Sequence, residues 1–312
     1  MKSAVITGAN GFVGRALTEE LRRQGIRVLA VARGRDEPVR DAQTVPPESN
    51  LAQIVPVTLD LARLAQLPTL TEERWDVFYH LAWSGTSGEG RKDINAQLFN
   101  IEASVEAVRV AKSLGCSRFI GAGSIMEREI LAASAEPQAR PGSGHIYSAA
   151  KLAAHQMSRC MAAELGISHI WAAITNAYGE GEASPRLLNT ILRKILRDEE
   201  LSFTSAVQNY DFIHVEDVAR AFRLLGQRGT PFAQYTVGSG RARPLRDFLR
   251  ELYQTVIPDR EPSFGGISFE GVSLPLEAFD TAPLYRDTGF VPEIGFPEGI
   301  CRTMSWLRQT LE

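Results

Sequence analysis

Two residues that could exchange a proton lie four positions apart: Tyr147 and Lys151. In a helix this spacing places both side chains on one face, one turn apart. An ammonium group beside a phenol favours the phenolate and therefore lowers the pKa of the phenol. A tyrosine tuned in this way can donate or accept a proton near neutral pH, well below its reference pKa of about 10. The spacing is common on surface helices, so the interpretation needs support from other segments.

A glycine-rich segment follows the first strand-like run. Gly8, Gly11 and Gly14 form the pattern G-x-x-G-x-x-G, a variant of the dinucleotide-binding fingerprint. The early glycines allow a tight turn and a close approach to a pyrophosphate, and the last allows a helix and a strand to pack closely. The helix that follows offers free N–H groups to the phosphate charge. The predicted cofactor-binding residues of this segment are Gly8, Asn10, Gly11, Phe12, Val13 and Gly14.

The end of the second predicted strand, Ala32-Arg33-Gly34-Arg35, indicates which cofactor is used. NAD sites usually place Asp or Glu here to bind the ribose hydroxyls, and these four residues include no carboxylate. A guanidinium can instead pair with a 2′-phosphate. Arg33 therefore favours NADP(H) over NAD; alternatively, Arg33 is solvated and another residue holds the ribose. Asp60 is a candidate partner for the adenine amino group, or else a helix N-cap.

The elements that must position these residues alternate along the first half of the chain. We predict strands at residues 4–7, 27–32, 54–57, 77–81, 119–122 and 168–174, with helices at 13–24, 93–114 and 146–165. Strands that alternate with helices predict right-handed crossovers and a doubly wound parallel sheet. The expected fold class is therefore α/β, of the Rossmann type.

The second half of the chain predicts a smaller C-terminal α/β lobe. Helices are expected at 186–197, before 225, at 244–257 and at 297–311, with strands at 210–215 and 235–237. Residues 258–296 are rich in Pro and Gly and are expected to be irregular. We predict an NAD(P)-binding domain of residues 1–175 plus about 208–237, and a substrate-binding lobe of residues 176–207 and 238–312.

Composition excludes several other classes of protein. The 312 residues carry a formal net charge of −3 and no long basic run, so no nucleic acid partner is expected. No apolar stretch approaches about 18 residues, so no membrane span is expected. The three cysteines are widely spaced and the histidines scattered, which predicts neither a disulfide framework nor a metal site. The N-terminus does not resemble a signal peptide, and a cytoplasmic location is expected.

Ser124 ends the fifth predicted strand, at the edge where ligands of open α/β sheets bind. Together with the glycine-rich segment and the Tyr147–Lys151 pair, it resembles the extended short-chain dehydrogenase/reductase family. More narrowly, the chain is similar to the nucleotide-sugar epimerase, dehydratase and ketoreductase branch. Further matches in order and spacing are His80-Leu81-Ala82, Asn100, Thr175-Asn176-Ala177-Tyr178-Gly179, the run from Asp211 to Ala219, and the stretch from Leu284 to Trp306.

The resemblance implies a role for each of these residues. Tyr147 would be the acid/base at a sugar carbonyl or hydroxyl, and Ser124 would hydrogen-bond the reacting oxygen. Lys151 would lower the pKa of Tyr147 and hold the nicotinamide ribose, while the cofactor carries out the hydride chemistry. Three residues would contact the cofactor, namely Leu81, Ala82 and Asn100, and Asn176 and Trp83 would contact the substrate.

The chain departs from the family pattern in two places. The residues after Ser124 are Ile125 and Met126, not the acidic residues of 4,6-dehydratases, so dehydration is disfavoured, although Glu127 comes next. Tyr210 stands where many sugar enzymes of the family have an arginine for the substrate diphosphate. The arginines that could substitute, or could simply be solvated, are Arg186, Arg193, Arg241 and Arg243.

These observations favour one reaction and leave alternatives. We expect NADPH-dependent reduction of a 4-keto group on a nucleotide-linked 6-deoxyhexose. The alternatives are an NAD-dependent nucleotide-sugar epimerase, a reductase of a smaller ketone or aldehyde, and a non-catalytic cofactor-binding sensor. The two long helices at 93–114 and 146–165 carry apolar residues beyond one stripe, which predicts a homodimer unless both simply cover the sheet.

Overall fold

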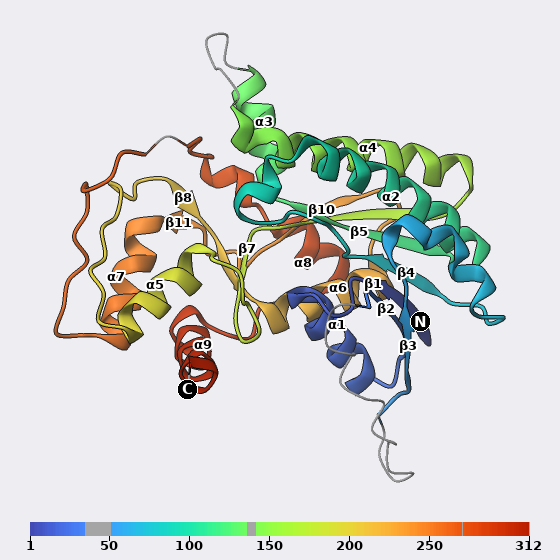
Figure 1. Cartoon of the computed structure of the whole chain (residues 1–312), viewed down its shortest axis with the longest axis horizontal. Coiled ribbons are helices and arrows are strands. Elements are labelled where there is room, and N and C mark those ends of the chain that lie inside the picture. Colours follow the sequence, from blue (N-terminus) through green and yellow to red (C-terminus); the bar gives the residue numbers. More distant parts are fainter. Residues whose placement is uncertain (35–50, 136–141, 270, 312) are drawn as a thin grey trace.

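The computed structural model describes residues 1–34, 51–135, 142–269 and 271–311. In this part of the chain the largest element is a seven-stranded sheet in the order β10-β6-β5-β4-β1-β2-β3, with every neighbouring pair parallel (Figure 1). The predicted doubly wound parallel sheet is confirmed. Its strands are β1 (Ser3–Thr7), β2 (Arg27–Ala32), β3 (Ile54–Thr58), β4 (Val77–His80), β5 (Arg118–Ser124), β6 (Ser168–Ile174) and β10 (Gln234–Val237).

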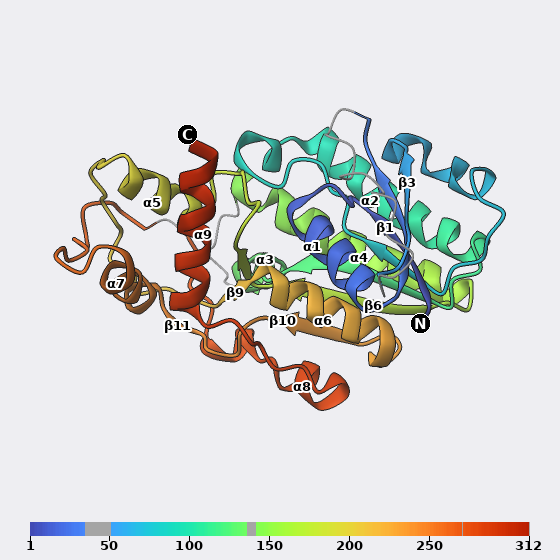
Figure 2. The ribbon, with the colours of Figure 1, turned by 90° about the horizontal axis from the view of Figure 1, so that it is seen from below.

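Helices cover both faces of this sheet. Helices α1 (Phe12–Arg23) and α6 (Val215–Arg228) lie on one face, and α2 (Ile94–Ser113) and α4 (Ile146–Glu164) lie on the other (Figures 1 and 2). On α1, Leu17 and Leu21 are spaced for one helical face and are fully buried against the sheet. Burial of both faces explains why the central strands read as continuous apolar runs.

A second group of segments packs around a separate aromatic cluster. Phe248 lies 5.0 Å from Phe212 and 4.9 Å from Phe296 between ring centroids. The segments around this cluster occupy the left of Figure 1. These segments are β7 (Asn176–Tyr178), β8 (Asn209–Tyr210), β9 (Phe212–His214), β11 (Arg243–Pro244), α5 (Leu187–Leu196), α7 (Leu245–Val256) and α9 (Phe296–Leu311).

Two local predictions were wrong, and one helix was missed. The strand expected at 210–215 is two short strands, because the buried carboxylate of Asp211 turns inward to the Ser239 hydroxyl. The region expected to be irregular contains α8 (Ala282–Thr288), which is too short to show a helical period and ends at the left-handed Gly289 (φ 73°). Helix α3 (Met126–Ala135) begins directly after β5 and was not predicted at all.

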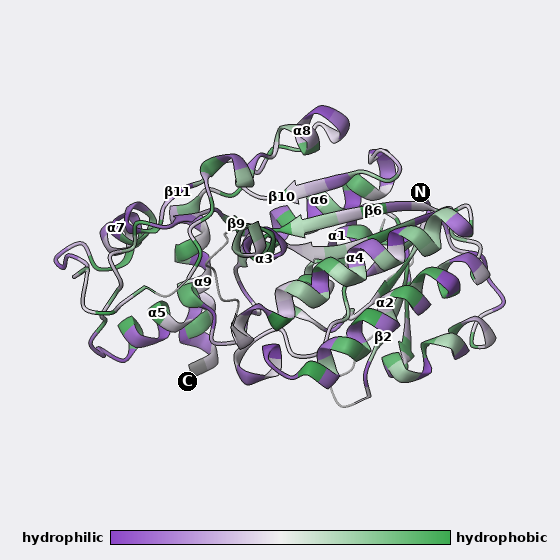
Figure 3. Ribbon diagram, turned by 90° about the horizontal axis from the view of Figure 1, so that it is seen from above, coloured by the Kyte–Doolittle hydropathy of each residue, from purple (hydrophilic) through white to green (hydrophobic). Residues whose placement is uncertain are grey.

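The outer surface of the helical layer formed by α2 and α4 is mixed in character. Figure 3 looks onto this layer, where hydrophobic residues lie between hydrophilic ones on both helices. Ile94 and Leu98 on α2 and Met157 on α4 are each more than half exposed. None of the helices in the described parts of the chain combines the length and the hydrophobicity of a membrane span.

Candidate active site

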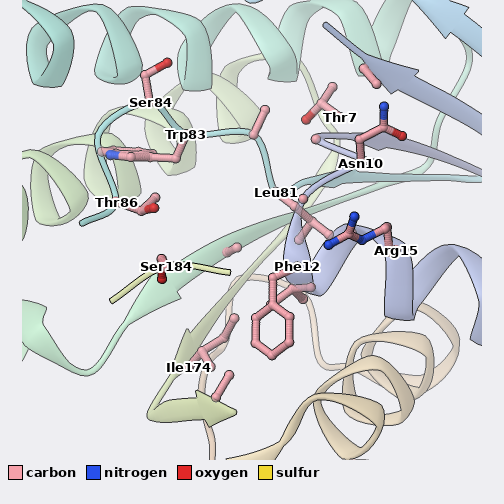
Figure 4. Close-up of a pocket in the computed structure, with 18 of the residues that line it drawn as sticks. Thr7, Asn10, Phe12, Arg15, Leu81, Trp83, Ser84, Thr86, Ile174 and Ser184 are labelled. Atoms are coloured by element: carbon pink, nitrogen blue, oxygen red, sulfur yellow. The ribbon is translucent and has the colours of Figure 1, made fainter. Parts of the chain in front are cut away.

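A cavity of about 440 Å³ opens at the carboxyl ends of the central strands. It lies where β1 and β4 are neighbours and the strand order reverses, which is where open α/β sheets bind ligands. Asn10 and Phe12 line it from the glycine-rich segment, and Leu81 and Trp83 line it from the chain after β4 (Figure 4). Distant segments of the sequence therefore meet at one sheet edge.

The backbone itself forms the floor of this cavity. Gly8 has a φ of +75°, and a Cβ there would lie 2.8 Å from the Ala82 Cα. A Cβ on Gly14 would lie 2.0 Å from the Gly8 carbonyl oxygen. The Gly11 N–H donates to that same oxygen at 2.9 Å, and Gly11 is the N-cap of α1 without a side chain to cap the helix. The cradle fits a pyrophosphate at the helix N-terminus, as predicted for a dinucleotide.

The three predicted catalytic residues line the same cavity. Ser124 ends β5, and Tyr147 and Lys151 lie one turn apart on α4. Tyr147 is 8% exposed, and the Ser124 hydroxyl favours the phenolate and so acts to lower the pKa of Tyr147. Lys151 is 5% exposed, and its ammonium group donates to the Ala122 carbonyl at 2.8 Å. A phenol, a hydroxyl and an amine thus converge beside a dinucleotide cradle, an arrangement suited to carbonyl–alcohol chemistry.

Comparison with known families supports this assignment. The sequence model of the NAD dependent epimerase/dehydratase family matches residues 4–238. The chain belongs to this family. It is an NAD(P)-dependent oxidoreductase of the short-chain dehydrogenase/reductase type, so the resemblance found in the sequence is confirmed.

Relatives of this family member match along its whole length. CDP-abequose synthase of Salmonella muenchen is 19% identical over 97% of both chains, and GDP-L-fucose synthase 1 of Arabidopsis thaliana is 23% identical over 96% of this chain and 91% of its own. Among solved structures, MoeE5 in complex with UDP-glucuronic acid and NAD is 23% identical with a TM-score of 0.78 over 99% of each chain. UDP-N-acetylglucosamine 4-epimerase from Methanobrevibacter ruminantium M1 is 19% identical, also with a TM-score of 0.78 over 99% of each chain. The two structural matches show a shared fold.

The structure contradicts the predicted electrostatics of the tyrosine–lysine pair. Burial raises the pKa of Tyr147, although the cations of Arg186 and Arg91 oppose this. Burial also lowers the pKa of Lys151 to about 7. The Lys151 ammonium lies 6.0 Å from the Tyr147 ring centroid and is directed at the Ala122 carbonyl. The Arg91 guanidinium lies closer, 4.7 Å from the same centroid, and sequence analysis missed this residue.

Asn100, predicted to contact the cofactor of the family, lies away from the cavity. Its amide is buried, with Nδ2 donating to the Ser84 carbonyl at 2.8 Å and Oδ1 accepting from the Ser84 N–H at 2.9 Å. Gln97 adds bonds from its Nε2 to the Gly85 and Gly90 carbonyls. These two buried amides clamp the loop that follows β4, because its polar backbone would otherwise lack partners.

The clamped loop forms one wall beside the catalytic residues. Trp83 contacts the Tyr147 ring edge-on at 6.0 Å, and its ring centroid is 3.6 Å from the Lys151 ammonium. The Trp83 indole N–H donates to Gln97 Oε1 at 2.8 Å. Trp83 therefore covers the Lys151 ammonium, and it lines the first cavity.

Of the two residues predicted to bind the adenosine part of the cofactor, one lines the cavity and the other does not. Asp60 is the N-cap of a 3₁₀ helix, Leu61–Thr69, and accepts from the Ala62 N–H at 2.9 Å. It does not line the cavity, so the N-cap alternative describes this residue. Arg33 does line the cavity, directly after β2, whereas Arg35 lies outside the described residues.

A second cavity of about 430 Å³ adjoins the first and shares Ser124 and Tyr147 with it. Asn176 lines it and donates to the Asp211 carbonyl at 3.2 Å. Its charged lining residues are Arg91, Glu129, Glu182 and Arg186. Burial raises the pKa of Glu129 to about 7.

The arginines proposed as diphosphate ligands divide into two groups. Arg186 lines both cavities and pairs with Glu182 at 3.1 Å. Arg193, Arg241 and Arg243 line neither cavity. Arg186 is therefore the one of the four that could meet a substrate phosphate at this site.

Proposed function

We propose that this enzyme reduces a 4-keto group on a nucleotide-linked 6-deoxyhexose with NADPH. The observation that carries the proposal is the convergence of Ser124, Tyr147 and Lys151 on a cavity that the glycine-rich loop also lines. The direction of the reaction rests on Arg33, because a guanidinium at the end of β2 favours a 2′-phosphate. NADPH is the form of the cofactor that reductive steps consume.

The residues that would hold the cofactor are those of the cradle and the chain after β4. The backbone of the glycine-rich loop and the N-terminus of α1 would bind the pyrophosphate. Arg33 would bind the 2′-phosphate, and Lys151 would bind the nicotinamide ribose. When bound, the nicotinamide supplies the hydride. The remaining contacts would come from Asn10, Phe12, Val13, Leu81 and Ala82, which all line the cavity.

The protein's own contribution is to position the carbonyl and to donate the proton. Tyr147 Oη would donate to the reacting oxygen, and Ser124 Oγ would hold that oxygen by a hydrogen bond. A positioned acid of this kind contributes about 10²–10⁴-fold in rate. The phenolate that remains would be stabilised by the nearby cations of Arg91 and Arg186. Trp83 would exclude water from the Lys151 ammonium.

A nucleotide-sugar substrate is supported by the second cavity and by the relatives. The cavity continues from Tyr147 towards Asn176 and Arg186, which gives a sugar and a phosphate polar partners. The full-length relatives are named as enzymes that make CDP- and GDP-linked sugars. Dehydration is disfavoured, since the nearest acid after Ser124 is Glu127, which is 1% exposed and lines neither cavity.

An NAD-dependent epimerase is the second candidate. The specific observation that favours it is that two solved proteins of the same fold, MoeE5 and UDP-glucuronic acid 4-epimerase from Bacillus cereus, form complexes with NAD. The same three catalytic residues would serve oxidation and re-reduction of one hydroxyl. The two candidates differ in whether the cofactor is consumed.

The decisive experiment offers the purified enzyme 4-keto-6-deoxyglucose linked to UDP, CDP, GDP or dTDP, with NADPH or NADH. A reductase consumes NADPH, and deuterium from labelled NADPH enters the product at C4. Tyr147→Phe is the control for background oxidation. Interconversion of C4-epimeric sugars without net cofactor consumption would replace the reductase by the epimerase. Reduction of small ketones or aldehydes alone would exclude the nucleotide-sugar substrate.

We also propose a homodimer that forms through α2 and α4. The exposed apolar residues Ile94, Leu98 and Met157 on these helices support it. Light scattering should give twice the monomer mass, and Leu98→Glu should shift the equilibrium towards the monomer. A monomeric mass for the unmodified enzyme would contradict the proposal.

A further inference from the structure

A buried carboxylate lies directly behind the catalytic serine. Glu127, in the first turn of α3, is 1% exposed. Its Oε1 accepts from the Ser124 backbone N–H at 2.7 Å, and both oxygens accept from the Trp171 indole N–H at 3.0 Å. Because both donors are N–H groups, the acceptor-only carboxylate form satisfies these bonds without a proton.

The strand that carries Ser124 is shaped to admit this arrangement. Trp171, on β6, lies across Gly121 and Gly123 of β5. A Cβ on Gly121 would lie 2.2 Å from Trp171 Cζ3, and a Cβ on Gly123 would lie 2.2 Å from Trp171 Nε1 and 2.7 Å from Glu127 Oε1. The two glycines therefore leave the space through which the indole N–H reaches the carboxylate.

A buried carboxylate needs both hydrogen-bond donors and a compensating charge. The nearest imidazole, His155, has its Nδ1 3.7 Å from Glu127 Oε2 and stacks on Trp171 with ring centroids 4.8 Å apart. His155 is one turn after Lys151 on α4, so both residues lie on the same face of that helix. The electrostatic influence of Glu127 reaches Lys151 and opposes the lowering of its pKa by burial.

We propose that Glu127 is a positioning residue, which fixes the backbone of Ser124 and places a negative charge against the face of α4 that carries Lys151 and His155. The proposal rests on the roles assigned above to Ser124 and Lys151. Glu127 does not touch the substrate, because it lines neither cavity. Its effect passes through the serine by a hydrogen bond and through the lysine by charge.

Besides the Ser124 N–H from β5, the groups that surround this carboxylate come from three further elements and define what a titration would report. From α4 they are Tyr147, Lys151 and His155; from β6 they are His169 and Trp171; and from α3 itself the charged neighbour is Arg128. The negative charge of Glu127 raises the pKa of both Tyr147 and Lys151. Removal of that charge must therefore lower both pKa values, so both groups should lose their protons at lower pH.

Glu127→Gln tests this because it keeps the shape of the side chain and removes the charge. Phenolate formation is followed by ultraviolet absorbance as the pH rises, for the unmodified enzyme and for Glu127→Gln. Subtracting the curve of the same protein with Tyr147→Phe leaves the titration of Tyr147, whose midpoint should be about one pH unit lower in Glu127→Gln. The alkaline loss of NADPH binding, followed by fluorescence, reports Lys151 and should also move to lower pH by about one unit. Neither measurement needs a sugar substrate, so failure of the proposed reaction and failure of this inference remain distinguishable.

Matched variants separate charge from structure. Glu164→Gln removes an exposed charge from α4 and should leave both titrations unchanged. Glu127→Asp keeps the charge on a shorter side chain, so its titrations should stay near those of the unmodified enzyme while turnover falls. If Glu127→Gln does not fold, Trp171→Phe removes one donor but keeps the charge of Glu127, so both midpoints should stay where they are or rise. Unchanged midpoints in a folded Glu127→Gln, or downward shifts in Trp171→Phe, would overturn the proposal.

Discussion

The two cavities that meet at Tyr147 are built from different parts of the polypeptide. The cofactor cavity has a floor of backbone atoms, where Gly14 packs against Gly8 and Gly8 against Ala82. The second cavity, which we propose holds the substrate, is lined by side chains from segments far apart in the sequence, among them Arg91, Glu129 and Asn176. A site made of backbone requires glycines at fixed local spacing, whereas a site made of side chains tolerates many combinations. A site made of backbone can therefore be recognised from the sequence, whereas a site made of side chains cannot.

The largest expected effect tests whether the boundary between the cavities is functional. Tyr147→Phe removes the phenolic hydroxyl from the wall that both cavities share. We expect kcat to fall about 1,000-fold, as for loss of a general acid, while the Kd for NADPH changes less than about twofold. Steady-state kinetics and fluorescence titration measure the two quantities. Retained turnover would show that another group supplies the proton.

Gly14→Ala tests the backbone-built cavity. The added methyl group would meet the Gly8 carbonyl oxygen at 2.0 Å, so the loop or the helix must shift. We expect NADPH affinity to fall about 100-fold, because inserting a methyl group into a tightly packed site costs up to about 3 kcal/mol. Gly295→Ala is the matched control, because nothing lies within 4 Å of a Cβ there. Equal affinities in both variants would break the contrast between the cavities.

Arg33→Ser tests the one side chain on which the choice of cofactor depends. Loss of the guanidinium should reduce the ratio of NADPH to NADH affinity by about tenfold, because one charge-assisted phosphate contact is removed. Competition binding with both cofactors gives this ratio, and Arg63→Ser, on the 3₁₀ helix that follows β3, serves as a control. An unchanged ratio would show that Arg33 does not select NADPH, and it would favour an NAD-dependent epimerase.

Lys151→Met tests how much the buried amine of Lys151 destabilises the folded enzyme. Burial lowers the pKa of Lys151 from its ordinary 10.5 to about 7, so between these pH values the unfolded chain holds a proton that the folded enzyme does not. The lysine therefore destabilises the fold fully below about pH 7, and the penalty disappears as the pH rises towards 10.5. We expect Lys151→Met to add about 1 kcal/mol to the free energy of unfolding at pH 7, after the loss of the Ala122 and Trp83 contacts.

Urea denaturation at several pH values measures this effect. The gain should shrink as the pH rises towards 10, and the exposed Lys112→Met should show no such trend. A destabilised Lys151→Met at pH 7 would mean that the contacts of the ammonium outweigh its burial.

The sequence predicted the structure correctly where that structure depends on residues close together in the chain. The strands of the main sheet and the long helices that cover it follow hydrophobic periodicity, and the left-handed Gly25 and Gly115 come just after α1 and α2, where glycine commonly ends a helix. The sequence did not decide what the side chains of Asp60 and Asn100 contact; in the structure both bind nearby backbone, and neither is among the residues that line the cavity. A polar residue near a binding loop can serve the ligand or the loop, and only the positions of neighbouring backbone atoms distinguish the two.

The sequence by itself determined the parallel sheet, the glycine cradle and the three residues that we propose as catalytic. These depend on local periodicity, on backbone freedom and on side-chain chemistry, which the residue types carry with them. The tertiary structure decided the electrostatics: that burial raises the pKa of Tyr147, that Arg91 lies over its ring, and that Glu127 lies behind Ser124. Burial and charge depend on which distant segments pack together, and no local spacing records that.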